Sequence, residues 1–201
     1  MNAEQVVDQF RATGALLEGH FQLSSGLHST VYLQCALVLQ FPEHAESFGR
    51  ALAEKFQGQG IQLVASPAIG GIVIGHEVAR ALGARFVWTE RESGEMTLRR
   101  GFTIAPGEKT LIVEDVITTG GSTRETIDAV RKAGADVVGA ASIIDRSGGS
   151  VDVGVPLSSL ASLRVLSVES SVCDACKLGE PVVKPGSRTQ KAYPQITQTD
   201  L

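Results

Sequence analysis

The sequence lacks three features that would each indicate a particular class of protein. It has no run of about 18 apolar residues, the length that a membrane-spanning helix needs, and its most apolar stretch, residues 63–74, is interrupted by Ser66, Pro67 and glycines. Its three cysteines are an odd number, which argues against a secreted disulfide scaffold. Residues 1–4 show neither the charged lead nor the apolar core of a signal peptide. We therefore expect a cytoplasmic protein that does not bind a membrane.

Clustered basic residues are also scarce. The 201 residues include 18 Lys and Arg against 22 Asp and Glu, and the net charge is −4. Sequence-independent binding of nucleic acid needs grouped cations, and the pair Arg99-Arg100 is too short to supply them. With 43% apolar and 20% charged residues, the chain suits one globular domain with a small appendage.

Strand and helix patterns alternate from residue 61 to residue 146. Apolar, β-branched runs that are typical of buried strands occur at 61–65, 85–88, 110–113 and 137–144, and amphipathic or Gly-flanked helical patterns separate them. This alternation predicts an α/β fold with a central parallel sheet flanked by helices. Ligands bind such sheets at the carboxyl ends of the strands, so the segments 67–71, 89–91, 114–122 and 145–146 are expected to converge on one site.

The flanking regions follow other patterns. Asn2 can cap a helix that runs to about Thr13, residues 19–39 alternate as in a β-hairpin, and Pro42 begins another helix. Residues 89–101 indicate a mobile hairpin. Beyond residue 149 the only further strand expected is 163–168, and residues 189–201 are expected to be a loose tail.

The central stretch, residues 110–125, reads T-L-I-V-E-D-V-I-T-T-G-G-S-T-R-E. A buried strand is followed by an acidic pair, a loop of small and hydroxylic residues, and a helix expected from about Thr123. Backbone N–H groups of a Gly-containing loop at a helix N-terminus bind phosphate, and the hydroxyl groups of Thr118, Thr119 and Ser122 add donors. The stretch therefore predicts a phosphate site.

The acidic pair, Glu114 and Asp115, would repel that phosphate. These carboxylates are better suited to accepting hydrogen bonds from sugar hydroxyls or to holding a divalent cation with oxygen ligands. Strand ends with Asp and helices capped by Thr or Ser are common as purely structural features. The contiguous order of strand, acidic pair, cradle and helix nevertheless favours a site for a ribose 5-phosphate.

Residues 111–123 resemble the phosphoribosyl-pyrophosphate (PRPP) motif of the type I phosphoribosyltransferases at every position. The run from Phe21 to Tyr32, Arg146 and the segment 184–188 together resemble the orotate phosphoribosyltransferase family, and the resemblance extends from about residue 14 to residue 188. It implies transfer of ribose 5-phosphate from PRPP to orotate, giving orotidine 5′-phosphate and pyrophosphate in pyrimidine biosynthesis. It also implies Mg²⁺ as cofactor and a homodimer in which the 89–101 hairpin closes over the partner's active site.

The resemblance assigns roles to individual residues. Glu114, Asp115 and Arg91 are the expected catalytic residues, and Mg²⁺ is carried by PRPP with Asp115 as a candidate ligand. Orotate is expected to contact Thr118, Arg146, Ser25 and Gly26. PRPP is expected to contact Arg91, Gly70, Gly71, Glu114, Asp115, Val116, Ile117, Thr118, Thr119, Gly120, Gly121 and Ser122.

Arg146 also has an alternative interpretation. A guanidinium group at a strand end can bind a planar carboxylate through two parallel hydrogen bonds. It can equally pair with Asp145 or Glu169 as an ordinary surface residue.

Three departures from the family pattern lie at the pyrophosphate end of the site. Lysines that are common in the family are replaced by Ser24 and Gly70, and the loop 90–95 lacks the usual Lys and His. Arg91 is the first candidate to bind pyrophosphate in their place, and Arg99 and Arg100 are the next. His28 is a substitute for the missing Lys beside Ser25-Gly26 or an ordinary surface residue. The backbone amides of Gly70-Gly71 can also bind the pyrophosphate.

Cys173 and Cys176 have the spacing of half a zinc site. A tetrahedral site needs four ligands, and the only other cysteine is Cys35. Two reduced thiols are therefore favoured over a zinc ion shared across a dimer. A redox role for the pair lacks a thioredoxin-like context.

We expect one domain over residues 1–188, with a core at about 42–148 and a small hood from about 14–40 and 150–188. Two rival functions remain open. A purine phosphoribosyltransferase would share the PRPP motif, although it has less reason for Arg146 and for the Ser25-Gly26 segment. A PRPP-sensing regulator without turnover is the other, although the sequence contains no DNA-binding helix pair.

Overall fold

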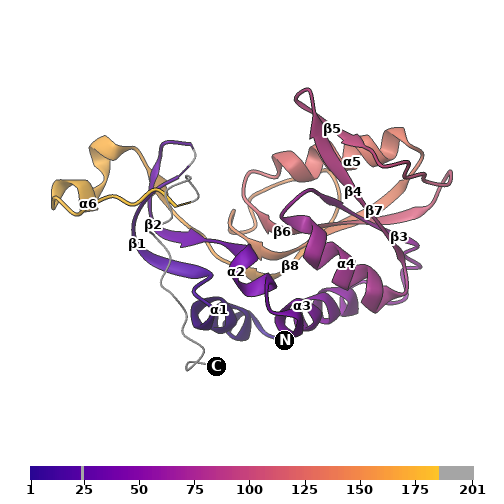
Figure 1. Ribbon diagram of the computed structural model, residues 1–201, viewed down its shortest axis with the longest axis horizontal. Coiled ribbons are helices and arrows are strands. Elements are labelled where there is room, and N and C mark those ends of the chain that lie inside the picture. Colours follow the sequence, from indigo (N-terminus) through magenta and orange to yellow (C-terminus); the bar gives the residue numbers. More distant parts are fainter. Residues whose placement is uncertain (24, 186–201) are drawn as a thin grey trace.

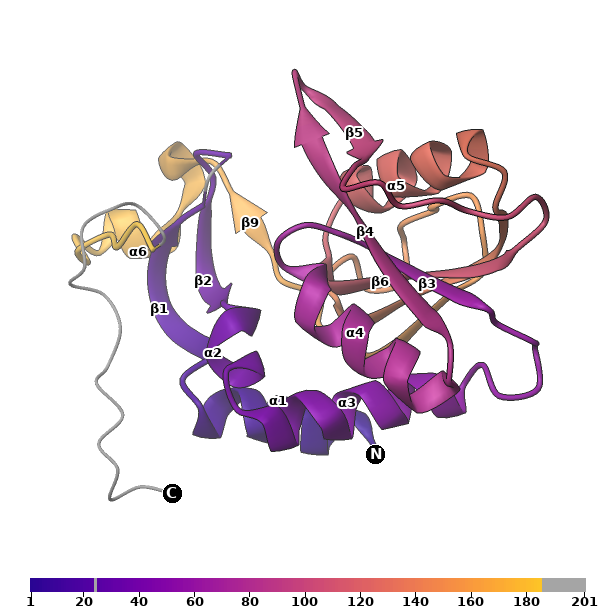
Figure 2. The ribbon, with the colours of Figure 1, turned by 45° about the vertical axis from the view of Figure 1, so that its right-hand side comes forward.

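The computed structural model describes residues 1–23 and 25–185 of the chain (Figure 1). Ser24, the end of the 184–188 segment and the predicted tail at 189–201 lie outside the described residues. Helices and strands divide into a large sheet with its helices and a smaller, separate sheet (Figures 1 and 2). No helix in the described ranges has both the length and the apolar character needed to cross a bilayer.

The large sheet has six strands in the order β5-β4-β3-β6-β7-β8. All neighbouring pairs are parallel except β4 and β5, which form an antiparallel hairpin. The strands are β3 (Leu63–Pro67), β4 (Arg85–Glu92), β5 (Glu95–Leu98), β6 (Lys109–Ile117), β7 (Asp136–Asp145) and β8 (Leu157–Ser162). The mostly parallel sheet predicted from the alternating pattern is confirmed.

Helices cover both faces of this sheet. Leu111 and Val113 of β6 pack on one face with residues of α1, α3 and α4, and Ile112 packs on the other face with Ile127 and Val130 of α5. Burial on both faces explains why β6 is a continuous apolar run rather than an alternating one. The helices are α1 (Ala3–Ala12), α2 (Cys35–Leu39), α3 (Pro42–Glu54), α4 (Gly71–Leu82) and α5 (Gly121–Lys132).

The small sheet, which we call the hood, has the order β1-β2-β9. Strands β1 (Leu16–Gln22) and β2 (His28–Leu33) form the predicted antiparallel hairpin, and β9 (Ser167–Val168) pairs with β2. The chain then passes through a 3-10 turn, η1 (Ser170–Val172), and the short helix α6 (Asp174–Lys177) before Val183 bridges to Phe21 of β1. The hood therefore joins segments from opposite ends of the sequence.

Several element boundaries differ from the sequence predictions. Strand β6 continues through the acidic pair to Ile117, and α5 begins at Gly121 rather than near residue 123. Residues 35–39 are helical instead of belonging to the hairpin. Strand β8 was missed and assigned to the hood, yet it forms the edge of the large sheet, and within 163–168 only β9 is a strand. The sequence Leu-Ser-Ser-Leu-Ala-Ser has weak strand propensity, so pairing with β7 determines its conformation.

Candidate functional site

The phosphate loop connects β6 to α5 at the carboxyl edge of the large sheet. Thr118 and Thr119 are exposed, and Gly120 adopts a left-handed conformation with φ of 72° at the N-cap of α5. A small pocket of about 70 Å³ is lined by Glu114, by Val116 and by each residue from Ile117 to Thr123. Backbone N–H groups at the start of α5 and two exposed hydroxyls thus border a space of phosphate size.

Gly120 is required here by its surroundings as well as by its backbone angle. A Cβ atom on this residue would lie 2.8 Å from Val151 Cγ2 and 2.9 Å from Val153 Cγ1. The Arg124 guanidinium group braces the same loop, donating to the carbonyl oxygens of Thr119 and Asp152 at 2.7 Å each. The loop is therefore held in shape by packing and hydrogen bonds that do not use its outward-facing donors.

Glu114 and Asp115 lie side by side under this loop. Glu114 is buried, and the loss of hydration together with the neighbouring Asp115 raises its pKa to about 9. Burial also raises the pKa of Asp115, although its carboxylate accepts hydrogen bonds from the Val116 N–H at 2.8 Å and from the Cys35 thiol. Glu114 is therefore a protonated donor to Asp115 at neutral pH.

The turn before α4 approaches this acidic pair. A Cβ atom on Gly70 would lie 2.9 Å from each carboxylate oxygen of Asp115, so any side chain at this position would have to displace that carboxylate. A Cβ atom on Gly71 would lie 3.0 Å from the Val113 carbonyl oxygen. The structure thus brings the predicted pyrophosphate turn, Gly70-Gly71, against the predicted ribose-binding pair.

A larger pocket of about 550 Å³ lies between the hood and the phosphate loop. Its polar lining includes Ser25, Tyr32 and Arg146 together with Thr118 and Thr119 of the loop, and leucines of the hood close its other side. Gly26 does not line this pocket; with φ of 86° it forms the turn of the hairpin next to Ser25. The segments 25–32, 118–119 and 146 therefore converge, as the sequence predicted for all but Tyr32.

Within the described part of the chain, Arg146 forms no ion pair with an acidic side chain. Its backbone N–H donates to the Ile117 carbonyl oxygen at 2.8 Å, which fixes it beside the end of β6. Its Nε is buried and has no hydrogen-bond partner among residues 1–23 and 25–185. Asp145 instead accepts hydrogen bonds from the N–H groups of Ser147 and Gly149, at 2.7 Å each. The alternative in which Arg146 pairs with Asp145 or Glu169 is wrong, and burial lowers the pKa of this guanidinium group.

The three candidate cations of the loop lie on or beside the β4–β5 hairpin, which projects from the sheet (Figure 2). Arg91 forms an ion pair with Glu125 of α5 and donates to the Gly94 carbonyl oxygen at 2.6 Å. Two acidic residues of the hairpin neutralise the other two cations. The pairs are Arg100 with Glu90 at 2.7 Å and Arg99 with Glu92 at 3.3 Å.

His28 does not substitute for the missing lysine. It is buried in the hood, where its Nδ1 lies 2.8 Å from His20 Nε2 and 3.2 Å from Cys176 Sγ. The sequence predicts no site role for Cys35, yet its thiol forms a hydrogen bond with Asp115. No local pattern in the sequence indicated this contact, because residues 35 and 115 are brought together only by the packing of α2 against the sheet.

Comparisons with known proteins agree with this geometry. Residues 38–159 match the family model described as "Phosphoribosyl transferase domain". The chain is 55% identical to the orotate phosphoribosyltransferase of Pelotomaculum thermopropionicum over 188 residues, covering 94% of this chain and 99% of that protein. The enzyme of the same name from Caldanaerobacter subterraneus subsp. tengcongensis is 50% identical, with the same coverage.

Solved structures with this fold include enzymes of different names. The orotate phosphoribosyltransferase from Aeropyrum pernix matches with a TM-score of 0.62 at 25% identity, covering 87% of this chain and 98% of that one. An adenine phosphoribosyltransferase from Rhodothermus marinus matches almost equally, with a TM-score of 0.61 at 26% identity over 80% of this chain and 99% of that one. The fold alone therefore does not identify the base, whereas the near full-length relatives at 50–55% identity do. The chain belongs to the phosphoribosyl transferase domain family and, within it, to the orotate phosphoribosyltransferases.

Proposed function

We propose that this chain transfers the ribose 5-phosphate group of PRPP to orotate, producing orotidine 5′-phosphate and pyrophosphate. The observation that carries the proposal is the shared wall of two pockets. Thr118 and Thr119 line both the small pocket at the phosphate loop and the larger pocket that contains Arg146, whose buried Nε has no hydrogen-bond partner among the described residues. A phosphorylated sugar in the first pocket and a planar carboxylate in the second would thus be held next to each other.

The phosphate loop anchors the donor in this mechanism. The 5-phosphate accepts hydrogen bonds from backbone N–H groups at the start of α5 and from the hydroxyls of Thr118, Thr119 and Ser122. Arg124 keeps the loop in position through its carbonyl contacts. The anchor fixes C1 of the ribose relative to the base pocket.

Glu114 and Asp115 act on the ribose. Their carboxyl oxygens accept hydrogen bonds from the ribose hydroxyls. Glu114, protonated in the unliganded chain, ionises as positive charge develops on the ring, and the pair then stabilises that charge. The bond from C1 to pyrophosphate breaks with its electron pair leaving on the pyrophosphate, and a ring nitrogen of orotate then bonds to C1 and loses its proton. No nucleophilic side chain is required.

Backbone N–H groups and a positively charged side chain bind the pyrophosphate. Amides of Gly70-Gly71 face the leaving group, and Arg91 exchanges its pairing with Glu125 for the pyrophosphate when the β4–β5 hairpin closes.

The acidic pair fits a divalent cation, because it is oxygen-rich and forms no ion pair within the described part of the chain. Asp115 would hold Mg²⁺ arriving with PRPP, and the ion would supply charge neutralisation of the leaving group. A homodimer with a shared active site and a cytoplasmic location remain predictions from the sequence.

The test is a spectrophotometric assay of orotate consumption with PRPP and Mg²⁺. Wild type should turn over orotate and not adenine, hypoxanthine or xanthine, and Arg146→Ala should raise the orotate KM without a comparable change in the KM for PRPP. Turnover of a purine base in preference to orotate would favour the purine enzyme. Tight PRPP binding with no product from any base would contradict the enzyme proposal and support a regulator.

A further inference from the structure

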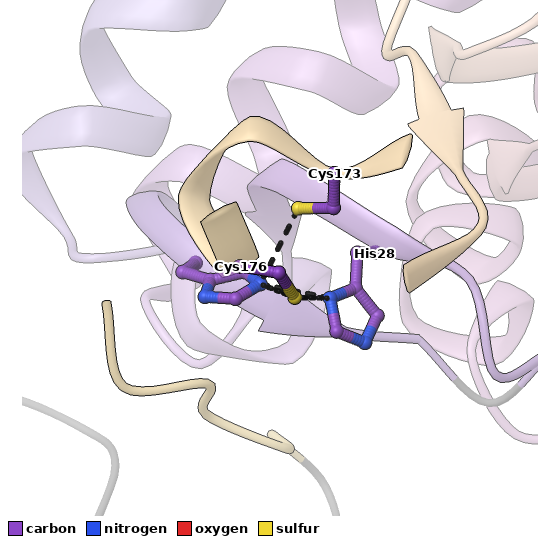
Figure 3. Close-up of side chains that lie close together, drawn as sticks. His28, Cys173 and Cys176 are labelled. Atoms are coloured by element: carbon purple, nitrogen blue, oxygen red, sulfur yellow. Dashed lines mark hydrogen bonds between the residues drawn. The ribbon is translucent and has the colours of Figure 1, made fainter. Parts of the chain in front are cut away.

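Four potential metal ligands meet in the hood, away from the pockets described above. They are His20, His28, Cys173 and Cys176, and their ligating atoms all lie within 4.8 Å of one another. Figure 3 shows the side chains of His28, Cys173 and Cys176 directed toward one centre. Neither cysteine is in a disulfide. The two ligands that the Cys-x-x-Cys pair lacked are therefore histidines of the same chain.

The spacing of the ligand atoms suits a tetrahedral ion. Zinc takes nitrogen at about 2.0 Å and sulfur at about 2.3 Å, which in a tetrahedron places nitrogen and sulfur about 3.5 Å apart. Here His20 Nε2 lies 3.5 Å from Cys173 Sγ and 3.6 Å from Cys176 Sγ, and His28 Nδ1 lies 3.2 Å from Cys176 Sγ. The two ring nitrogens, at 2.8 Å, would separate by about 0.5 Å around an ion of this size.

The β1–β2 hairpin brings the two histidines together. His28 pairs with Gln22, and His20 lies two residues before Gln22, at the irregularity in the register between Glu18 and Phe21. The buried rings meet there, with His20 Nε2 2.8 Å from His28 Nδ1. The other ring nitrogen of His20, Nδ1, lies 3.0 Å from the Glu180 carbonyl oxygen. Such a contact orients a ligating histidine and leaves Nε2 unprotonated and directed at the metal.

We propose that these four residues bind one Zn²⁺ ion that fastens the C-terminal part of the hood to the β1–β2 hairpin. Two thiolates and two neutral imidazoles balance the charge of the ion, which suits a site where three of the four ligands are buried. The set has four protein ligands and no open position, so the ion is structural and takes no part in the transfer reaction.

The C-terminal segment of the hood, residues 166–184, has almost no apolar core that would hold it in place. Between residues 166 and 184, Cys173 is the single buried residue. Val172 and Leu178, on either side of the ligand pair, are 58% and 76% exposed. Helix α6 has only four residues, too few to be stable without tertiary contacts. Bound zinc would supply the stabilisation that apolar packing does not.

Metal content of the untagged full-length chain, purified under reducing conditions, tests the proposal. Wild type should contain one zinc per chain, and Cys173→Ser/Cys176→Ser and His28→Gln should each lose at least tenfold in occupancy at limiting Zn²⁺. His76→Gln removes an exposed histidine outside the cluster and should keep full occupancy. Equal zinc content in wild type and the double cysteine variant would overturn the assignment.

Cobalt gives a readout that needs no variant. Apoprotein titrated with Co²⁺ should develop tetrahedral visible bands and a thiolate charge-transfer band, both saturating at one ion per chain. Trypsin should also cut after Lys177, next to Cys176, at least tenfold faster in the chelated protein than in the zinc form. Absence of the thiolate band, or equal cleavage of both forms, would contradict the proposal. Activity is not used, so failure here leaves the proposed transferase reaction untouched.

Discussion

Replacing Glu114 by Gln should make the unliganded protein more stable while making it a worse enzyme. Burial and the adjacent Asp115 raise the pKa of Glu114 to about 9, from an ordinary value of 4.5. In the folded chain the group therefore stays protonated at neutral pH, whereas in the unfolded chain it ionises. Gln keeps the volume and a donor for Asp115, and it has no proton to lose on unfolding.

The magnitude follows from proton linkage. A carboxyl group whose folded pKa is raised favours the folded state fully below pH 4.5 and progressively less as the pH rises toward 9. Each pH unit in that interval removes about 1.4 kcal/mol from the free energy of unfolding, so by pH 7 the loss is about 3 kcal/mol. Glu114→Gln should recover this amount at pH 7 and almost none of it at pH 4.5.

Urea unfolding from pH 5 to pH 8 is the assay, followed through the fluorescence of Trp88, the single tryptophan, at one fixed chain concentration. The measured quantity is the difference in unfolding free energy between variant and wild type at each pH. Glu54→Gln is the matched control, because Glu54 is exposed. Its difference from wild type should stay within about 0.5 kcal/mol at every pH.

A difference between Glu114→Gln and wild type that does not grow with pH would refute the reasoning, since Glu114 would then be ionised in the folded chain. The activity of the same variant supplies the second half of the prediction. Glu114 is protonated in the unliganded chain, but it can ionise when positive charge develops on the ribose, whereas Gln cannot, so kcat should fall at least about tenfold. Greater stability with unchanged kcat would remove Glu114 from the catalytic residues.

Three further predictions address the rest of the site. Arg146→Lys keeps the charge but not the two parallel donors, and should raise the KM for orotate at least about tenfold while the KM for PRPP stays constant. Gly120→Ala should lower the unfolding free energy by about 1–3 kcal/mol more than Gly58→Ala, because both glycines have positive φ but only the first would bring a Cβ into contact with side chains; urea unfolding measures this. Arg91→Ala should raise the KM for PRPP at least about tenfold, and Arg99→Ala, whose guanidinium group is paired within the hairpin, should leave it within about twofold.

The central part of the fold and the loop between β6 and α5 were predictable because they are encoded locally. A run such as Leu111–Val113, apolar at consecutive positions, indicates a strand covered on both faces, and the structure buries it completely. The loop that follows contains its own phosphate donors within five residues. The convergence of Thr118 and Arg146 needed one further rule, that the ends of parallel strands share an edge. Ser25 lies in the hood, and only the family resemblance placed it at this pocket.

What could not be predicted depends on contacts between distant segments. Strand β8 has no strand signal of its own and exists through its pairing with β7. The sequence favours two reduced thiols at Cys173 and Cys176 over a zinc ion shared across a dimer, and it gives no sign that two histidines lie beside them. His20 lies at the irregularity of the β1–β2 hairpin, and Cys173 is brought to it by the return of a segment 153 residues away. The hydrophobic periodicity of the sequence indicates neither the geometry of the hairpin nor the return of the C-terminal segment.

The pyrophosphate end of the site has fewer positive charges than is usual in the family. The lysines common in the family are replaced by Ser24 and Gly70, so this chain must hold the leaving group with other charges. Gly70 lies so close to Asp115 that a side chain at this position would have to displace the carboxylate. Arg91 already pairs with Glu125 in the first turns of α5, beside the phosphate loop. We therefore expect the pyrophosphate of PRPP to replace Glu125 as the anion that pairs with the Arg91 guanidinium group.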